Sequence, residues 1–457
     1  MHAAAPARIE RAENSAASPL RWRGFNLQNM FWKGWKEGRF SDYDFRLIQA
    51  LGFNFVRLPL DYRIWTADPE KLAWIDEAVA LGEKYAIHVC LNLHRAPGYT
   101  VDGDEAEPGD LWTDIALQDA FVAQWKNFAT RYQGISATRL SFNLVNEPTG
   151  ASEEVIAAIL ERAARAIWKI SPDRPVVVDG LDWGTRPLKT LANLPLIQAT
   201  RGYQPRDVVR NTDNRPPAAW PQVRLNAYLY GDGKPALQSP LRLFGSFPRG
   251  KVRIAVEEVA VGADLEISAD NIFLAAKHFE AGLVGGAWSE FQIGPAAKEL
   301  KLQLRKGDWL RFRSIEFVPD VLTQDQTILR LPATDFKDGL RQGELYLDPT
   351  GVDVARSPMF DRAWLLDTQM PPWLALQKNG VQVFVGEAGA PKSSPHAVYL
   401  AWLEDNLANW KAAGWGWALW DFRGEFGIFD SQRTDVNYED FEGAKLDRGL
   451  LKLLQRY

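Results

Sequence analysis

Apolar positions along this chain fall into two alternating kinds of segment. Eight short runs are apolar at nearly every position and rich in β-branched or aromatic residues, which is typical of parallel strands buried on both faces. Longer stretches lie between them, and their apolar residues recur every three or four positions, which indicates amphipathic helices. The eight runs are Trp22–Leu27, Phe53–Leu60, His88–His94, Leu140–Asn146, Pro175–Leu181, Leu196–Tyr203, Val381–Gly386 and Trp415–Trp420.

Helix start signals support the alternation. Ser41 and Asp44 form a capping-box pattern, and Asp68-Pro69 supplies an N-cap followed by a proline at the first helical position. An apolar stripe runs from Val155 to Ile167 at helical spacing. Eight strands with helices between them predict an α/β fold, the (β/α)₈ TIM barrel.

The alternation is interrupted once, after the sixth predicted strand. About 175 residues precede the seventh, far more than an ordinary strand-to-helix connection needs. Here the pattern changes to short runs of alternating apolar and polar residues, separated by turns with glycine and proline, which predicts an inserted antiparallel β-sandwich. The clearest runs are Val223–Tyr230, Leu241–Phe247, Lys251–Val259, Leu300–Leu304 and Trp309–Val318. A helix over Ala363–Lys378 then resumes the barrel pattern.

These patterns divide the chain into four segments. Residues 1–20 are expected to be a disordered lead, 21–220 the first part of the barrel with strands one to six, 221–350 the inserted β-sandwich, and 351–457 the second part of the barrel with strands seven and eight. The lead has no apolar signal core, and we interpret it as what remains after a leader was removed and a start methionine added.

Composition narrows the classes of partner. Hydrophobic residues make up 46% of the 457 and charged residues 24%, as in an ordinary soluble globular protein. The net charge of −5 is spread without a basic block, which argues against nucleic acid as a partner. No apolar run is long enough to span a membrane. Cys90 is the single cysteine, so the chain forms no internal disulfide.

Two of the predicted strands end in a glutamate. Glu147 follows the run Leu140–Asn146, and Glu387 follows Val381–Gly386. A carboxylate at the end of a buried strand is costly unless it is used, and the carboxyl ends of barrel strands are where catalytic residues gather. Two carboxyls there predict a general acid/base and a nucleophile facing each other.

Short motifs surround these glutamates and the ends of strands two and three. They are Val56-Arg57-Leu58-Pro59, Leu93-His94-Arg95-Ala96-Pro97-Gly98, Asn146-Glu147-Pro148 and Gly386-Glu387. In their order and their places at strand ends they resemble glycoside hydrolase family 5, the cellulase family of retaining β-glycosidases. The resemblance covers about Trp22 to Pro217 and Phe360 to Tyr457, and does not extend to the insertion.

The resemblance implies roles for individual residues. Glu147 would be the acid/base and Glu387 the nucleophile of a double displacement. Arg57 would hold the nucleophile ionised and oriented. Asn146 would donate a hydrogen bond to the sugar 2-hydroxyl, and His94 would line the −1 subsite.

Four further residues complete the expected site. Trp420 would form the floor under the −1 sugar, and Asn26 is counted among the substrate-binding and supporting residues. The family usually has His-x-Tyr at the end of strand six, where this chain has Arg201-Gly202-Tyr203. Tyr203 would keep its hydrogen bond to the nucleophile. Arg201 adds a permanent positive charge, which would change the pH optimum or recognise a polar or charged sugar substituent.

No cofactor and no catalytic metal are expected. The five histidines have no i, i+4 pair and no cysteine cluster accompanies them. A structural calcium ion at Asp102, Asp104, Glu105 and Glu107 is an alternative hypothesis for these acidic residues. Nineteen tryptophans suit both core packing and stacking on sugar rings. Two or three of those in predicted loops or strand ends are expected to line subsites: Trp32, Trp35, Trp65, Trp112, Trp183 and Trp220.

The function that the resemblance implies is a retaining hydrolase of β-linked glucan, an endo-β-1,4-glucanase (EC 3.2.1.4), secreted or periplasmic. A β-mannanase, a xyloglucanase and an exo-acting β-glycosidase are the alternatives within the family. A non-catalytic glycan-binding protein is the alternative of another class. The insertion is a carbohydrate-binding module or a lid over the cleft in one hypothesis, and a structural or oligomer-contact element in the other.

Overall fold

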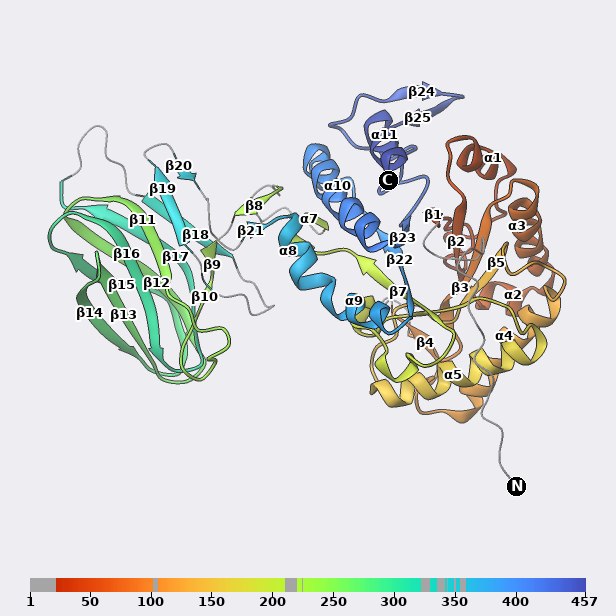
Figure 1. Ribbon diagram of the computed structural model, residues 1–457, viewed down its shortest axis with the longest axis horizontal. Coiled ribbons are helices and arrows are strands. Elements are labelled where there is room, and N and C mark those ends of the chain that lie inside the picture. The colour runs from red at the N-terminus through yellow and green to blue at the C-terminus, as the bar shows by residue number, and fades with distance from the viewer. Residues whose placement is uncertain are drawn as a thin grey trace. The chain divides into compact units, whose positions relative to one another are not determined.

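The computed structural model describes residues 22–101, 106–209, 220–223, 225–321, 329–334, 342, 344–348, 351–353 and 359–457. The chain forms two compact units, shown in Figure 1. One combines the residues up to Trp220 with Asp361–Tyr457, and the other is Pro221–Phe360. The expected disordered lead and the acidic residues 102–105 lie outside the described residues.

Eight parallel strands close the first unit into a barrel, within the residues described. Each strand pairs with the next along the chain, and the last pairs with the first. The predicted (β/α)₈ barrel is therefore confirmed, and each of the eight predicted runs overlaps one of its strands. The strands are β1 (Arg23–Asn26), β2 (Phe55–Asp61), β3 (His88–Ala96), β5 (Leu140–Asn143), β6 (Val176–Asp179), β7 (Ile197–Gly202), β22 (Gln382–Ala388) and β23 (Gly416–Leu419).

Helices cover the outside of the barrel. The longer ones are α1 (Asp42–Ala50), α3 (Leu72–Lys84), α4 (Ile115–Arg131), α5 (Glu153–Ile170), α9 (Pro371–Lys378), α10 (His396–Ala413) and α11 (Arg448–Arg456). The Ser41 hydroxyl accepts from the Asp44 backbone N–H at the start of α1, as its capping pattern predicts. None of the described helices is long and apolar enough to cross a membrane.

Shorter elements connect these parts. The predicted helix over Ala363–Lys378 is broken into α8 (Arg362–Trp364), the π-helical η4 (Leu365–Gln369) and α9, because Pro371 and Pro372 favour the start of a new helix. The remaining elements of this unit are α2 (Arg63–Ala67), η2 (Pro69–Lys71), β4 (Tyr99–Thr100), α6 (Leu181–Gly184), η3 (Lys189–Leu191), α7 (Arg206–Val209), β24 (Glu439–Phe441) and β25 (Ala444–Leu446).

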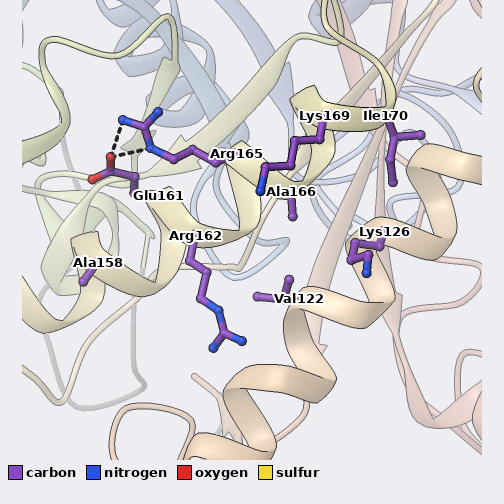
Figure 2. Close-up of a pocket in the computed structure, with 9 residues that line it drawn as sticks. All are labelled: Val122, Lys126, Ala158, Glu161, Arg162, Arg165, Ala166, Lys169 and Ile170. Atoms are coloured by element: carbon purple, nitrogen blue, oxygen red, sulfur yellow. Dashed lines mark hydrogen bonds and ion pairs between the residues drawn. The ribbon is translucent and has the colours of Figure 1, made fainter.

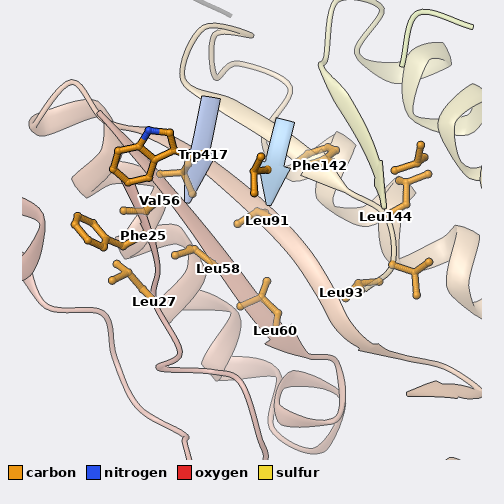
Figure 3. Packing of buried hydrophobic residues seen from close by; sticks show 14 of the residues in the cluster. Phe25, Leu27, Val56, Leu58, Leu60, Leu91, Leu93, Phe142, Leu144 and Trp417 are labelled. Carbon is orange, nitrogen blue, oxygen red and sulfur yellow. The ribbon is translucent and has the colours of Figure 1, made fainter. Parts of the chain in front are cut away.

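Side-chain alternation on the barrel strands determines what faces the centre. On β2, Val56, Leu58 and Leu60 pack outward into the large core between strands and helices, shown in Figure 3. Phe55 belongs instead to a small cluster with residues of other barrel strands. Since successive side chains point to opposite faces, Arg57 shares the inward face with Phe55 and lies closer to the carboxyl end of the barrel.

The second unit is built from two sheets of six described strands each. One contains β9 (Leu225–Asn226), β10 (Tyr228–Tyr230), β12 (Gly250–Val259), β15 (Gly282–Ile293), β17 (Trp309–Pro319) and β18 (Leu329–Thr334). The other contains β11 (Leu241–Phe247), β13 (Ala263–Ala269), β14 (Ile272–Phe279), β16 (Ala297–Lys306), β19 (Glu344–Asp348) and β20 (Gly351–Asp353). Buried apolar side chains of both sheets form one cluster, as in a β-sandwich.

The sandwich is inserted between barrel strands β7 and β22, as the sequence predicts. Two short strands, β8 (Gln222–Val223) and β21 (Met359–Phe360), pair with each other where the chain enters and leaves this unit. The sequence prediction named no strand between residues 260 and 299, whereas the structure has β13, β14 and β15 there. Most of β14 is exposed or half-buried, so its apolar and polar positions do not separate into two faces.

Candidate active site

Both glutamates lie at the carboxyl ends of barrel strands, and an arginine from a third strand joins them. Arg201 Nε on β7 donates to Glu147 Oε1 over 2.7 Å. Arg201 Nη2 lies 3.2 Å from Glu387 Oε1 on β22. One guanidinium therefore contacts two carboxyl groups that are far apart in the sequence.

Glu387 is held by two further donors. Arg57 Nη1 donates to Glu387 Oε1 over 2.6 Å, and the Tyr203 hydroxyl donates to Glu387 Oε2 over 3.2 Å. Burial and the nearby negative charges of Glu387 and Glu147 raise the pKa of Tyr203 well above its ordinary value. The tyrosine therefore keeps its proton and remains a donor, so both oxygens of Glu387 have a fixed partner.

Glu147 occupies a different environment. Burial, together with the negative charges of Glu387 and Asp179, raises the pKa of Glu147 to about 7, against the opposing effect of Arg201. Its backbone φ of 45° lies in the left-handed region that non-glycine residues seldom adopt. The Tyr99 hydroxyl donates to its carbonyl oxygen over 2.7 Å. A carboxyl with a pKa near 7 can hold and release a proton near neutral pH, as an acid/base must.

Arg57 organises the floor of this site through asparagine side chains. Its Nη1 donates to Asn26 Oδ1 over 2.9 Å, and its Nη2 donates to Asn146 Oδ1 over 2.8 Å. Asn26 Nδ2 in turn donates to the backbone carbonyls of Gly386 and Leu419, which lie on β22 and β23. The predicted supporting residue Asn26 thus ties the first strand to the last two, next to Glu387.

His94 and Trp420 form one wall. The Asn146 side-chain amide lies 3.3 Å from His94 Nε2. Burial and the positive charges of Arg57 and Arg201 lower the pKa of His94 well below its usual range, so the ring is neutral. The Trp420 ring lies 5.5 Å from the His94 ring and 5.6 Å from the Phe31 ring, measured between centroids.

A cavity of about 680 Å³ opens over these groups. Seven of the predicted site residues line it: His94, Asn146, Glu147, Arg201, Tyr203, Glu387 and Trp420. Arg57 and Asn26 lie beneath it, completely buried. Of the six loop tryptophans, Trp183 is among its described lining residues, and its side chain is half exposed. Trp65 and Trp112 are buried in the barrel core instead.

Asp179 is the residue that the sequence prediction missed. It ends β6, is completely buried, and pairs with both Arg201 and Arg57. Its signal was available, because the run Val176-Val177-Val178-Asp179 is another apolar strand that ends in a carboxylate. The prediction passed over it because the residue belongs to none of the motifs quoted for the resemblance.

A second cavity lies on the outside of the barrel between α4 and α5, shown in Figure 2. Its volume is about 570 Å³. Glu161 is the one acidic residue among the nine that line it, and it is paired with Arg165. A single carboxylate bound to arginine does not supply an acid and a nucleophile, so the cavity over Glu147 and Glu387 is the candidate active site.

Comparisons with known proteins concern the barrel as a whole and not its individual site residues. The family model described as cellulase (glycosyl hydrolase family 5) matches residues 13–211. A β-xylosidase of Phanerodontia chrysosporium is 27% identical over 168 residues, which are 34% of this chain and 35% of the relative. Endoglucanase C of Acetivibrio thermocellus is 28% identical over 162 residues, which are 34% of this chain and 46% of the relative.

A solved structure described as a glycoside hydrolase is similar over most of the chain. It has 27% sequence identity and a TM-score of 0.62, and the match covers 95% of this chain and 99% of that one. The similarity therefore extends over the barrel and the inserted β-sandwich. Residues 13–211, which include the first six barrel strands, therefore carry the match to glycosyl hydrolase family 5. The matched segments span less than half the length of the two curated relatives.

Proposed function

We propose that the protein is a retaining glycoside hydrolase that cleaves β-linked glucan with Glu147 and Glu387. The observation that carries the proposal is the contrast between two carboxyls in one cavity. The pKa of Glu147 is raised to about 7, whereas Glu387 accepts from an arginine and a tyrosine. When two neighbouring carboxyls have different environments, their pKa values differ. One can then stay protonated as the acid while the other stays ionised as the nucleophile.

The chemistry follows in two displacements. In the first, Glu387 attacks the anomeric carbon while Glu147 gives its proton to the departing oxygen, so a glycosyl-enzyme ester forms and the aglycone leaves. In the second, Glu147 takes a proton from water, whose oxygen attacks the same carbon and releases Glu387. Each carboxyl returns to its starting protonation state.

The remaining wall residues suit the sugar of the −1 subsite. Asn146 lies between Arg57 and His94, where its amide is held to meet a ring hydroxyl. Trp420 lines the cavity beside Phe31 and presents a flat apolar surface of the kind on which sugar rings stack. Arg201 makes its hydrogen bonds to protein groups, and its side chain is only 2% exposed. These contacts favour a role in the protonation of the site over direct recognition of a charged sugar.

For the substrate we propose a β-1,4-glucan cut internally (EC 3.2.1.4), and one of the two relatives above is an endoglucanase. The other is a β-xylosidase, which keeps exo action among the alternatives, together with β-mannan and xyloglucan. Product size separates them, because endo action yields a ladder of oligosaccharides and exo action a single small product. A polymeric glucan is met outside the cytoplasm, so we propose a secreted or periplasmic enzyme, which cell fractionation would test.

The decisive experiment compares the wild type with Glu147→Gln and Glu387→Gln. Substrates are carboxymethyl cellulose, barley β-glucan, xyloglucan, glucomannan, xylan and aryl β-glycosides. Activity on one of them should fall by orders of magnitude in both variants. Glu161→Gln, in the outer cavity, is the matched control and should keep full activity. Binding without hydrolysis by the wild type would favour the alternative, a non-catalytic glycan-binding protein.

The inserted β-sandwich has a proposed role of its own, apart from that of the barrel. Phe273 on β14 and Leu283 on β15 are 61% and 81% exposed, and apolar surface of this kind favours a binding role. We propose that the sandwich binds the polysaccharide. Replacing residues 221–360 by a short glycine-serine linker should weaken adsorption to insoluble β-glucan. Unchanged adsorption and unchanged kinetics would leave a structural role instead.

A further inference from the structure

Asp179 is a buried carboxylate to which the proposed reaction gives no role. It is absent from the described residues that line the cavity, so a bound sugar does not meet it there. Its Oδ1 accepts from Asn143 Nδ2 over 2.9 Å. Its Oδ2 accepts from Arg201 Nη2 and, over 3.1 Å, from the backbone N–H of Glu147. Asp179 therefore contacts both the expected acid and the arginine that binds that acid.

The positive charge of Arg201 opposes the protonation that Glu147 needs to act as an acid. Its Nε lies 2.7 Å from Glu147 Oε1, and the side chains of Arg201 and Glu147 are only 2% and 13% exposed. A permanent cation at that distance stabilises the carboxylate form and opposes protonation. A general acid must instead carry its proton at the working pH. The arginine can direct the Glu147 carboxyl without ionising it where burial and nearby negative charges together offset its own charge.

The geometry points to Asp179 as a positioning residue that supplies such a charge, alongside Glu387. We infer that Asp179 pairs with Arg201 and holds the Glu147 backbone, so that Glu147 stays protonated while Arg201 fixes its direction. The inference deepens the proposed function and rests on it for its catalytic meaning. The protonation of Glu147, however, can be measured in the free protein whether or not a substrate is known.

The charges around Glu147 balance when it is protonated. Burial raises the pKa of Tyr203 and lowers that of His94, so both are neutral near pH 7. The two arginines then face the two remaining carboxylates, and a protonated Glu147 leaves the group without net charge. The charged and titratable groups that act on Glu147 directly are Asp179 on β6, Arg201 on β7, Tyr203 just after β7 and Glu387 on β22. Arg57 on β2 and His94 on β3 contact its neighbour Asn146.

Asp179 also stabilises the backbone at the acid. Glu147 has a φ of 45°, which costs free energy for a residue with a side chain. The hydrogen bond from its N–H to Asp179 Oδ2 and the one from Tyr99 to its carbonyl hold this conformation from both sides. The same carboxylate thus sets the position of Glu147 as well as its charge environment.

The test is a titration of Glu147 in the full chain, by ¹³C NMR of protein labelled at the glutamate carboxyls. The Glu147 signal is identified by its loss in Glu147→Gln. In Asp179→Asn the pKa of Glu147 should fall by about one to two units, because Arg201 is then offset by Glu387 alone. In the double variant with Arg201→Gln it should rise again. A structural role alone would not reverse the direction.

Two further variants keep the result decisive. Arg201→Gln alone should raise the pKa of Glu147 above that of the wild type, which tests the same pairing if Asp179→Asn folds poorly. Asp179→Glu keeps the carboxylate and should leave the titration near that of the wild type. An unchanged pKa of Glu147 in both Asp179→Asn and Arg201→Gln would overturn the inference.

Kinetics separate this inference from the proposed function. If the wild type hydrolyses a glucan, the alkaline limb of its pH profile should move to lower pH in Asp179→Asn and back in the double variant. If the wild type hydrolyses none of the substrates, the proposed function fails. The titration still decides whether Asp179 controls the protonation of Glu147.

Discussion

Replacing Arg57 by methionine is the most demanding test of how this site is built. Methionine keeps an unbranched side chain, and the substitution removes the positive charge and all the N–H donors of the guanidinium. It leaves the partners of the arginine buried, with two carboxylates sharing a single guanidinium, that of Arg201. The acceptors that lose Arg57 are Asn26, Asn143, Asn146, Asp179 and Glu387.

The magnitude follows from burial. The side chains of Arg57 and Glu387 are 1% and 4% exposed, and removing one partner of a buried ion pair costs about 3–5 kcal/mol. Arg39→Met is the matched control, since Arg39 and its partner Glu77 are 62% and 41% exposed and such pairs contribute about 0–1 kcal/mol. We therefore expect the two variants to differ severalfold in their loss of unfolding free energy.

Urea unfolding followed by tryptophan fluorescence measures this difference. Trp288 and Trp309 are the two tryptophans of the sandwich, and the other seventeen lie in the barrel segments, so the signal reports mainly on the barrel. A loss for Arg57→Met no larger than that for Arg39→Met would refute the reasoning. It would mean that the asparagines and carboxylates find other partners once the arginine is gone.

Three further predictions concern the site and the core. The pKa of Glu147 is raised to about 7, and its protonated form acts as the acid. We therefore expect kcat/KM for hydrolysis to decline above about pH 7, by roughly tenfold per pH unit. A profile that stays flat to pH 9 would contradict this. Trp183→Ala should raise KM for oligosaccharides by roughly tenfold through lost stacking, with little effect on glycosides that have a small alkyl leaving group. Equal losses on both substrates would argue against a stacking role. Burial raises the pKa of the Cys90 thiol to about 12, so the native protein should not react with a thiol reagent such as DTNB. The urea-unfolded protein should react and release one equivalent of the coloured thiolate. Rapid reaction of the native protein would be evidence against this packing.

The barrel could be predicted because its strands leave a strong local signal. Runs such as Phe53–Leu60 are short, mostly apolar at successive positions and rich in aromatic or β-branched residues, which together favour a strand buried on both faces. Arg57 stands out in its run for the same reason, since a charge inside a buried strand needs partners. The sequence does not show which partners these are, because Asn26 and Asn143 reach it from other strands.

Asp179 and the strands β13 to β15 show where prediction from sequence ends. The role of Asp179 depends on its ion pair with Arg201, which lies on the neighbouring strand β7. The sequence around Asp179 does not show that this pair forms. In β14 the exposed residues include Ile272 and Phe273, so apolar character does not mark the buried face. Contacts that depend on two distant segments, or on a face open to solvent, therefore escape a pattern based on neighbours.

The pairing of β8 with β21 has a consequence for the order of folding. Barrel strand β22 must find β7 although the whole sandwich separates them along the chain. Once β8 and β21 have paired, the two ends of the insertion are held together and the loop to be closed shrinks to the short segments outside it. By the logarithmic dependence on loop length this lowers the entropic cost of closure by about 1 kcal/mol. A sandwich that folds first would thus act as an intramolecular chaperone that helps the barrel to close.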